Sequence, residues 1–213
     1  ERVSIAATWF RDNFPGEVLY AVKANPSPWA LDAYYASGLR GFDVASEEEI
    51  KLVTSRYPDA KLAFMHPVKS RKAIERAYFE HGVRTFSLDC EAELEKIVAA
   101  TQRAEDLTLV VRLAVNNADA VYALSNKFGA SEEAAAPLLQ KARGYADNLG
   151  VSFHVGSQCM NPSAFRDAMD LASRIIVKAG VIVDVVDVGG GFPSAYPGMT
   201  PPDLELYVQV IKS

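Results

Sequence analysis

The sequence predicts an α/β fold of the (β/α)8 TIM-barrel type, and three observations lead to this prediction. Short apolar runs alternate with runs of helical character along most of the 213 residues. The apolar runs are nearly continuous, which is typical of parallel strands covered by helices. About seven such β-then-α steps follow one another, with no linker, low-complexity segment or close repeat between them. A doubly wound sheet has the same features, so the pattern leaves both architectures open.

Each apolar run is expected to form a strand that leads into a helix. The expected strands are residues 20–24, 41–45, 61–65, 85–88, 107–115, 151–155 and 181–188. The expected helices are residues 2–13, 28–37, 47–56, 71–81, 91–100, 132–149 (with a bend near Gly144), 162–180 and 204–211.

Helix starts are marked by capping residues. Ser27 precedes a proline at the first helical position, and Ser46 with Glu49 has the spacing of a capping box. Asp89 is expected to cap the helix 91–100. Residues 116–130 form the longest connection, and a connection of that length inside a compact domain is often functional.

Length and composition limit the classes of protein that fit. Residues 1–213 are expected to form one domain, but an eight-step barrel needs about 250 residues, so the barrel is incomplete at its C-terminal end. The net charge of −5 argues against a nucleic-acid partner. No apolar run approaches the roughly 18 residues of a membrane span. Cys90 and Cys159 lack metal or redox spacing, which fits a reducing compartment, and we expect a cytoplasmic protein.

Polar residues gather where the expected strands end. In barrels the active site lies at the C-terminal ends of the strands. The residues at these positions are Lys23, Asp43, His66, Asp89, Arg112, His154 and Gly189–Gly191. The three histidines of the chain lie in separate segments, so no metal site is predicted.

Lys23 ends the first expected strand, which reads as a short buried run of Tyr, Ala and Val. A buried lysine is usually paired, neutral or used covalently, because an unpaired buried cation is costly. Such a lysine can be an amine nucleophile for imine chemistry. The alternative is a strand-end lysine whose side chain reaches water.

Gly189-Gly190-Gly191 follows the last expected strand. Glycines let a backbone approach an anion closely and direct N–H groups at it, and late loops of barrels are the usual phosphate site. We favour a phosphate site over a plain turn. The motif is neither a Walker loop nor a G-x-G-x-x-G fingerprint. His154 lies at the end of the expected strand 151–155, and a lone histidine at such a position is more often a structural residue than a catalyst.

Together these stretches resemble the fold-type III pyridoxal-phosphate decarboxylases of basic amino acids, the ornithine decarboxylase group. The likeness covers nearly the whole chain, with the motifs in family order and spacing. The matching stretches are Tyr20-Ala-Val-Lys-Ala-Asn25, Gly41-Phe-Asp-Val-Ala-Ser46 with Glu49, Thr85-Phe86 with Asp89, Val111-Arg112-Leu113, Leu124-Ser-Asn-Lys-Phe-Gly-Ala130, Ser152-Phe-His-Val-Gly-Ser157 and Asp187-Val-Gly-Gly-Gly-Phe-Pro193.

The resemblance implies a role for individual residues. Lys23 would form the imine with pyridoxal 5'-phosphate (PLP), and His154 would stack on the pyridine face. The phosphate would be held by Ser157, Gly189, Gly190 and Gly191.

Other roles follow from the same resemblance. Asp43 and Arg112 would lie near the imine and the ring hydroxyl. Lys127 would lie near the subunit interface of a homodimer of the full-length protein. Glu49 is the least specific match, since its place in the capping box already explains it.

The resemblance also implies the reaction and what the chain lacks. We expect decarboxylation of ornithine or lysine to a diamine, as in polyamine biosynthesis. The family's Glu-Pro-Gly-Arg strand and its C-terminal β-domain have no counterpart here, so the 213 residues alone are expected to be inactive and poorly soluble or oligomeric. Diaminopimelate decarboxylase, an amino-acid racemase such as alanine racemase, and a non-catalytic homologue that binds PLP or a partner protein remain alternatives.

Overall fold

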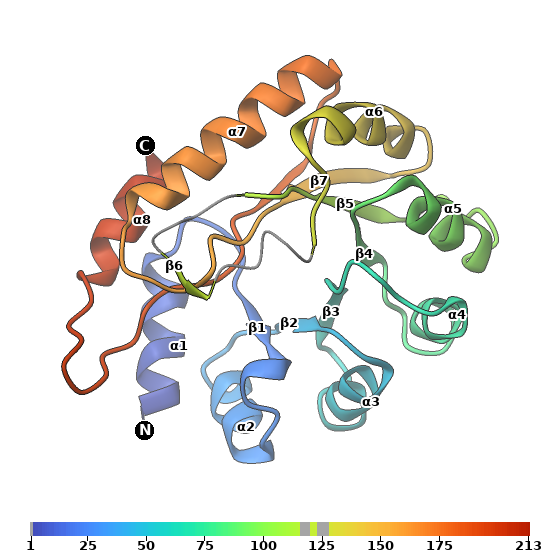
Figure 1. The fold of residues 1–213 in the computed structure, drawn as a ribbon. Coiled ribbons are helices and arrows are strands. Elements are labelled where there is room, and N and C mark those ends of the chain that lie inside the picture. Colours follow the sequence, from blue (N-terminus) through green and yellow to red (C-terminus); the bar gives the residue numbers. More distant parts are fainter. Residues whose placement is uncertain (1, 116–119, 123–127) are drawn as a thin grey trace.

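A computed structural model describes residues 2–115, 120–122 and 128–213 (Figure 1). Its helices are α1 (Arg2–Asn13), α2 (Pro28–Ala36), α3 (Glu47–Arg56), α4 (Arg71–Phe79), α5 (Glu91–Ala100), α6 (Glu132–Arg143), α7 (Ser163–Ala179) and α8 (Leu204–Lys212), with a 3₁₀ helix η1 (Val22–Ala24). Its strands are β1 (Leu19–Ala21), β2 (Gly41–Val44), β3 (Lys61–Phe64), β4 (Thr85–Leu88), β5 (Thr108–Arg112), β6 (Ala120–Tyr122), β7 (Asn148–Ser152), β8 (Ser157–Cys159) and β9 (Val185–Asp187). Along these described ranges, no helix is both long and apolar enough to cross a membrane.

The order of the strands decides between the two architectures that the sequence left open. Seven strands pair in parallel in the order β1-β2-β3-β4-β5-β7-β9, which is their order along the chain. A doubly wound sheet would reverse direction at a switch point. Here α2 to α7 follow one another around the outside of a curled sheet (Figure 1). The prediction of a barrel-type α/β fold is therefore confirmed.

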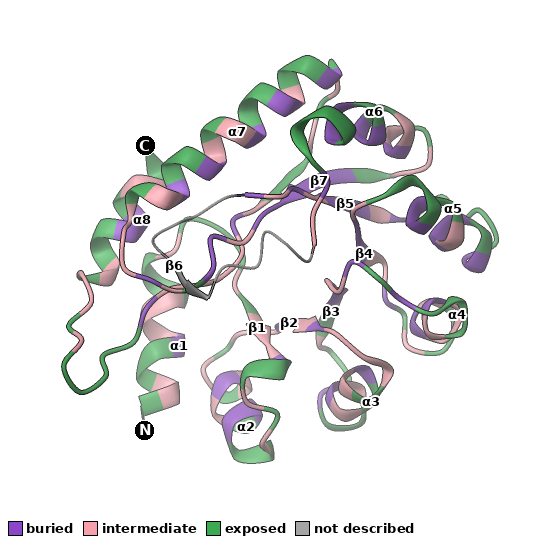
Figure 2. Cartoon of the chain, in the orientation of Figure 1, coloured by how far each residue is buried: buried purple, intermediate pink, exposed green. Residues whose placement is uncertain are grey.

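The core lies between the sheet and the helices that cover it. In Figure 2 the helices turn buried residues toward the strands and exposed residues outward. Phe42, Phe64 and Phe86 from adjacent strands are almost completely buried. Burying a side chain of this size stabilises the fold by about 1.5–3 kcal/mol. The strands thus form a rigid wall whose C-terminal ends carry the polar residues.

Three predictions of element bounds are wrong: the first strand, the end of the helix 132–149, and the strand 151–155, which the structure replaces with β7 at Asn148–Ser152. The chain leaves β1 after Ala21 and forms η1, so residues 22–24 are not a strand. Helix α6 ends at Arg143 rather than near residue 149, because Asp147 and Asn148 donate their N–H groups to Leu107 O and start β7 there. The other five strands lie within their predicted ranges.

A second, smaller sheet was not predicted. Strands β6 and β8 pair antiparallel, with Tyr122 opposite Ser157 and Ala120 opposite Cys159. This pair brings part of the long connection after β5 to the loop after β7. Both strands are three residues long, too short for a periodic pattern to mark them in the sequence.

Candidate functional site

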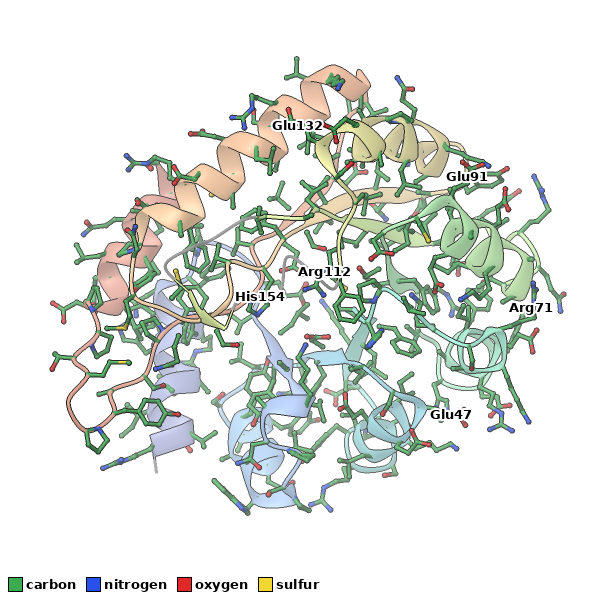
Figure 3. The ribbon with its side chains drawn as sticks, viewed as in Figure 1. Glu47, Arg71, Glu91, Arg112, Glu132 and His154 are labelled. Carbon is green, nitrogen blue, oxygen red and sulfur yellow. The ribbon has the colours of Figure 1, made fainter. Side chains whose placement is uncertain are left out.

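The predicted site residues converge at the C-terminal ends of the parallel strands. Lys23 lies just after β1, Asp43 in β2, Arg112 at the end of β5 and His154 just after β7. Figure 3 shows Arg112 and His154 within the curve of the sheet, whereas Glu91 lies out among the helices.

Lys23 is exposed rather than buried. The turn η1 places Val22 in the core and leaves the Lys23 side chain 58% exposed, with its Nζ 3.8 Å from Asp43 Oδ2. The hydroxyl of Tyr20 donates to Asn25 O at 3.1 Å and closes this turn. The expectation of a buried strand ending in lysine is therefore wrong, because the chain turns one residue before Lys23 and leaves its side chain largely exposed beside Asp43.

Asp43 carries a carboxylate oxygen with no partner among the described residues. Its Oδ1 is buried and accepts no hydrogen bond there, and only Oδ2 faces Lys23. Burial raises the pKa of Asp43 to about 6; Lys23 partly offsets this rise and Asp187 adds to it. A buried acceptor without a donor is costly, so a bound group with a hydrogen to donate would be stabilised here.

Arg112 and Asp187 are close enough to influence each other's protonation. Burial lowers the pKa of Arg112, and the carboxylates of Asp89, Asp43 and Asp187 oppose this shift. Burial raises the pKa of Asp187, although its Oδ1 accepts from Gly189 N at 2.8 Å. The Arg112 guanidinium lies 5.4 Å from the ring centre of Phe128. Charges of both signs thus share one partly buried region.

His154 has a neutral ring at physiological pH. Its Nδ1 accepts a hydrogen bond from Gly156 N at 2.9 Å, which leaves Nε2 as the nitrogen that carries the proton. Burial, together with the positive charges of Arg112 and Lys23, lowers the pKa of His154 to about 4. A Cβ atom on Gly190 would lie 3.7 Å from His154 Nε2, so the ring borders the glycine loop.

The glycine loop has a backbone that only glycine fits. Gly189 and Gly191 have φ angles of +69° and +98°, and a Cβ on either would lie 2.2 Å from a backbone oxygen. Among the described residues, the N–H groups of Gly190 and Gly191 have no hydrogen-bond acceptor. Successive free N–H groups of this kind form a nest for an anion. Ser157, exposed at the start of β8, lies on the neighbouring loop.

Three further predictions have different outcomes. Asp89 does not cap α5, whose N-cap is Cys90; its Oδ2 accepts instead from Gly129 N at 3.0 Å, because the helix begins one residue later than a cap at Asp89 requires. Glu49 does have a capping role, since its N–H donates to Ser46 Oγ and its Oε2 accepts from Ala45 N. Lys127 lies outside the described residues.

Sequence reasoning missed roles for Asp187 and Phe128, although both lie in quoted motifs. Asp187 ends β9 and is separated from the glycines by one residue, so the strand-end rule that selected Asp43 applies to it equally. Phe128 has no such signal, because it lies between Arg112 and His66 only through the tertiary fold. Within the described ranges, no group of three His, Cys, Asp or Glu side chains is placed to hold a metal ion.

Comparison with known proteins identifies the family. Residues 2–213 match the family model described as "Pyridoxal-dependent decarboxylase, pyridoxal binding domain". The chain belongs to the pyridoxal-dependent decarboxylases. It is 35% identical over 181 residues to a lysine/ornithine decarboxylase of Selenomonas ruminantium, covering 83% of this chain and 45% of that protein. It is 37% identical over 181 residues to mouse ornithine decarboxylase, covering 83% of this chain and 38% of that protein. The chain thus spans less than half the length of these curated relatives.

Solved structures of decarboxylases share the fold. A double mutant of the lysine decarboxylase SrLDC, solved in complex with PLP, aligns with a TM-score of 0.86 and 31% identity, covering 99% of this chain and 56% of that one. A lysine/ornithine decarboxylase from Vibrio vulnificus, solved with putrescine, aligns with a TM-score of 0.79 and 29% identity, covering 99% and 55%. The cofactor of this pyridoxal-dependent decarboxylase family is therefore PLP.

The residues present fit this cofactor. An exposed amine at Lys23 suits its aldehyde, and the free N–H groups of Gly190 and Gly191 suit its phosphate. The neutral ring of His154 offers a flat apolar surface, and Asp43 Oδ1 offers an acceptor that lacks a donor.

Proposed function

We propose that this chain is the PLP-binding part of a decarboxylase that converts a basic amino acid, lysine or ornithine, into a diamine for polyamine biosynthesis. The observation that carries the proposal is the convergence of the Lys23 amine, the neutral His154 ring and the free N–H groups of the glycine loop at one end of the sheet. Relatives with both substrates in their names support the choice of substrate class. We further propose that the full-length protein is a cytoplasmic homodimer.

Each residue has a distinct task in this proposal. When bound, PLP supplies the electron sink that accepts the electron pair left by the departing CO2. Lys23 Nζ holds the cofactor covalently, and Gly190 and Gly191 bind its phosphate through their N–H groups. His154, uncharged, packs on the ring without adding a positive charge beside it.

Asp43 places a titratable carboxyl group beside the lysine amine. Its Oδ2 lies 3.8 Å from Lys23 Nζ, and its pKa of about 6 lets it change charge near physiological pH. A carboxyl group whose pKa lies near the working pH can accept and return a proton. Arg112, half-buried and without a carboxylate ion pair among the described residues, contributes a fixed positive charge at the same end of the sheet.

Reduction with borohydride tests the covalent assignment. PLP should give the purified full-length protein an absorbance band in the near-visible, and reduction followed by peptide mapping should label Lys23. Lys61, an exposed lysine at the opposite end of β3, serves as the internal control and should stay unlabelled. A label on another lysine would remove Lys23 from the site.

A CO2-release assay tests the activity. Lysine and ornithine should each be tried, with arginine and diaminopimelate as comparisons. If borohydride reduction of one sample labels Lys23 and an unreduced sample of the same protein releases no CO2 from any of these amino acids, the result would support the non-catalytic alternative over the decarboxylase.

A further inference from the structure

Gln158 has an unusual backbone for its residue type. Its φ angle of +54° lies in the left-handed region. Among the described residues other than glycine, Gln102 and Arg103 also have a φ angle in this region. A side chain in this region costs free energy and persists only where other contacts hold it. Gln158 follows Ser157 directly and lies two residues after Gly156, whose carbonyl borders the glycine loop. The strain therefore lies beside the proposed phosphate site.

The side chain of Gln158 forms a two-way clamp with Ser194. Its Nε2 donates to Ser194 O at 2.9 Å, and its Oε1 accepts from Ser194 N at 2.8 Å. A side-chain amide can donate to and accept from the backbone of one residue at the same time, whereas a carboxylate cannot donate and a thioether is at best a weak acceptor. Because Ser194 lies three residues beyond Gly191, the clamp ties β8 to the segment that leaves the glycine loop.

A second set of bonds connects the same two segments. Cys159 N donates to Gly191 O at 2.9 Å, and the buried Tyr207 hydroxyl donates from α8 to Cys159 O at 2.7 Å. Gly191 also touches the carbonyl of Gly156 so closely that a Cβ there would lie 2.2 Å from its oxygen. The glycine loop is thus in contact with Gly156, which precedes Ser157, and with Cys159, which follows it, so its distance from Ser157 is fixed.

We propose that Gln158 is a positioning residue that sets the spacing between Ser157 and Gly189–Gly191, and so the shape of the phosphate site. The inference rests on the proposed role of these residues in binding the cofactor phosphate. The strained backbone of Gln158 directs its amide to Ser194, and the two hydrogen bonds offset the strain. Without the clamp the glycine loop keeps its glycines but loses one of its two ties to β8.

The test separates phosphate binding from general loss of structure. Gln158→Met keeps the side-chain length and loses the clamp, whereas Gln158→Gly loses the clamp but relieves the backbone strain. Both should weaken PLP binding about tenfold, the expected effect of two net hydrogen bonds. Both should bind pyridoxal, which has no phosphate, within about twofold of the wild-type protein.

The control variant is Gln102→Gly, which relieves the same kind of strain at the end of α5 and should leave both affinities unchanged. Melting of the cofactor-free protein should show Gln158→Gly at least as stable as Gln158→Met.

Three results would overturn the inference. Equal losses for PLP and pyridoxal would make Gln158 a merely structural residue, and unchanged affinity for both would show that the clamp does not shape the site. Wild-type protein that binds no PLP would overturn the proposed function together with this inference. If the wild-type protein binds PLP and the variants bind it equally well, the inference alone is overturned and the proposed function stands.

Discussion

At the N-terminal end of β2, two nitrogen atoms of the Arg40 guanidinium donate hydrogen bonds to the protein. Its Nε donates to Asp59 Oδ2 at 2.9 Å, its Nη1 donates to the carbonyls of Tyr35 and Leu39, and its guanidinium lies 3.9 Å from the ring centre of Tyr35. The Tyr35 hydroxyl donates to the other oxygen of Asp59. The three side chains close a clamp.

Arg84 repeats this clamp at the N-terminal end of β4. Its Nε donates to Asp106 Oδ2 at 2.6 Å, the Tyr78 hydroxyl donates to Asp106 Oδ1 at 2.7 Å, and the guanidinium lies 4.0 Å from the Tyr78 ring centre. The spacing from arginine to aspartate is 22 residues here and 19 in the first clamp, so no fixed period reveals the repeat in the sequence.

At the C-terminal end of the sheet, charged side chains are incompletely paired. Lys23 and Asp43 lie 3.8 Å apart, at the limit of an ion pair, and Asp43 Oδ1 has no partner among the described residues. Arg112 contacts a phenylalanine ring. One end of the sheet therefore uses charges to hold neighbouring βα units together, and the other holds charges ready for a ligand, as in barrels generally.

The largest effect on cofactor binding should come from replacing one lysine with alanine at each end of the sheet. Lys23→Ala should abolish the near-visible absorbance and weaken PLP binding about a hundredfold or more, because the covalent link is lost. Lys61→Ala removes an exposed lysine that is paired with Glu17 at 3.1 Å and should leave cofactor binding unchanged. Spectral titration of both variants measures the difference. An equal loss of PLP binding in both variants would contradict the assignment of cofactor binding to the C-terminal end of the sheet.

A smaller effect on the cofactor is expected at the glycine loop. Gly190→Val would press a branched side chain against His154 and displace N–H groups from the phosphate, so PLP affinity should fall about tenfold or more. Melting of the cofactor-free protein should change less. Gly144→Val at the opposite end, after α6, should leave affinity intact. An unchanged PLP affinity in Gly190→Val would argue against a phosphate nest at this loop.

The fold was predictable from the sequence because apolar strands and helix caps are local signals. The strand ends that place Asp43, Arg112 and His154 follow from the same signals. The turn at Lys23 was not predictable, since apolar residues continue through it and the hydrogen bond of Tyr20 to Asn25 O that helps to close it has no signal in the sequence. The hydrogen bonds of Gln158 to Ser194 and of Gly129 to Asp89 join segments that are far apart in the sequence, and Gln158 also has a strained backbone. A pattern within one segment cannot predict such contacts.

Carboxylates at the two ends should respond to pH with opposite signs. Asp43 has its pKa raised from 3.8 to about 6, so the folded state binds its proton more tightly and stability falls as pH rises through this interval. Asp43→Asn should therefore stabilise the cofactor-free protein at pH 8 by about 1–3 kcal/mol and have little effect below pH 4.

The matched variant is Asp106→Asn. The hydrogen bond from the Tyr78 hydroxyl is the main cause that lowers the pKa of Asp106, so its stabilising effect is present at neutral pH and is lost as pH falls through the folded pKa. Asp106→Asn should lower the melting temperature at pH 8. Denaturant unfolding of both variants across roughly pH 2–8 checks the signs. Destabilisation by Asp43→Asn at pH 8 would show that Asp43 is structurally paired after all.

The smallest effect should come from Arg84→Lys, which separates geometry from charge within a clamp. Lysine keeps the positive charge but lacks the planar fork that binds Asp106 while it stacks on Tyr78, so the melting temperature should fall by about 1–3 °C. Arg84→Ala should lower it by about 2–6 °C, and neither variant should change PLP affinity. Repeating the melts in high salt distinguishes the causes, because salt screens exposed charges but not ring stacking. If high salt removed the difference in melting temperature between wild type and Arg84→Ala, the clamp would act through charge alone. The contrast between the two ends of the sheet would then rest on how charges are paired rather than on how the arginines are packed.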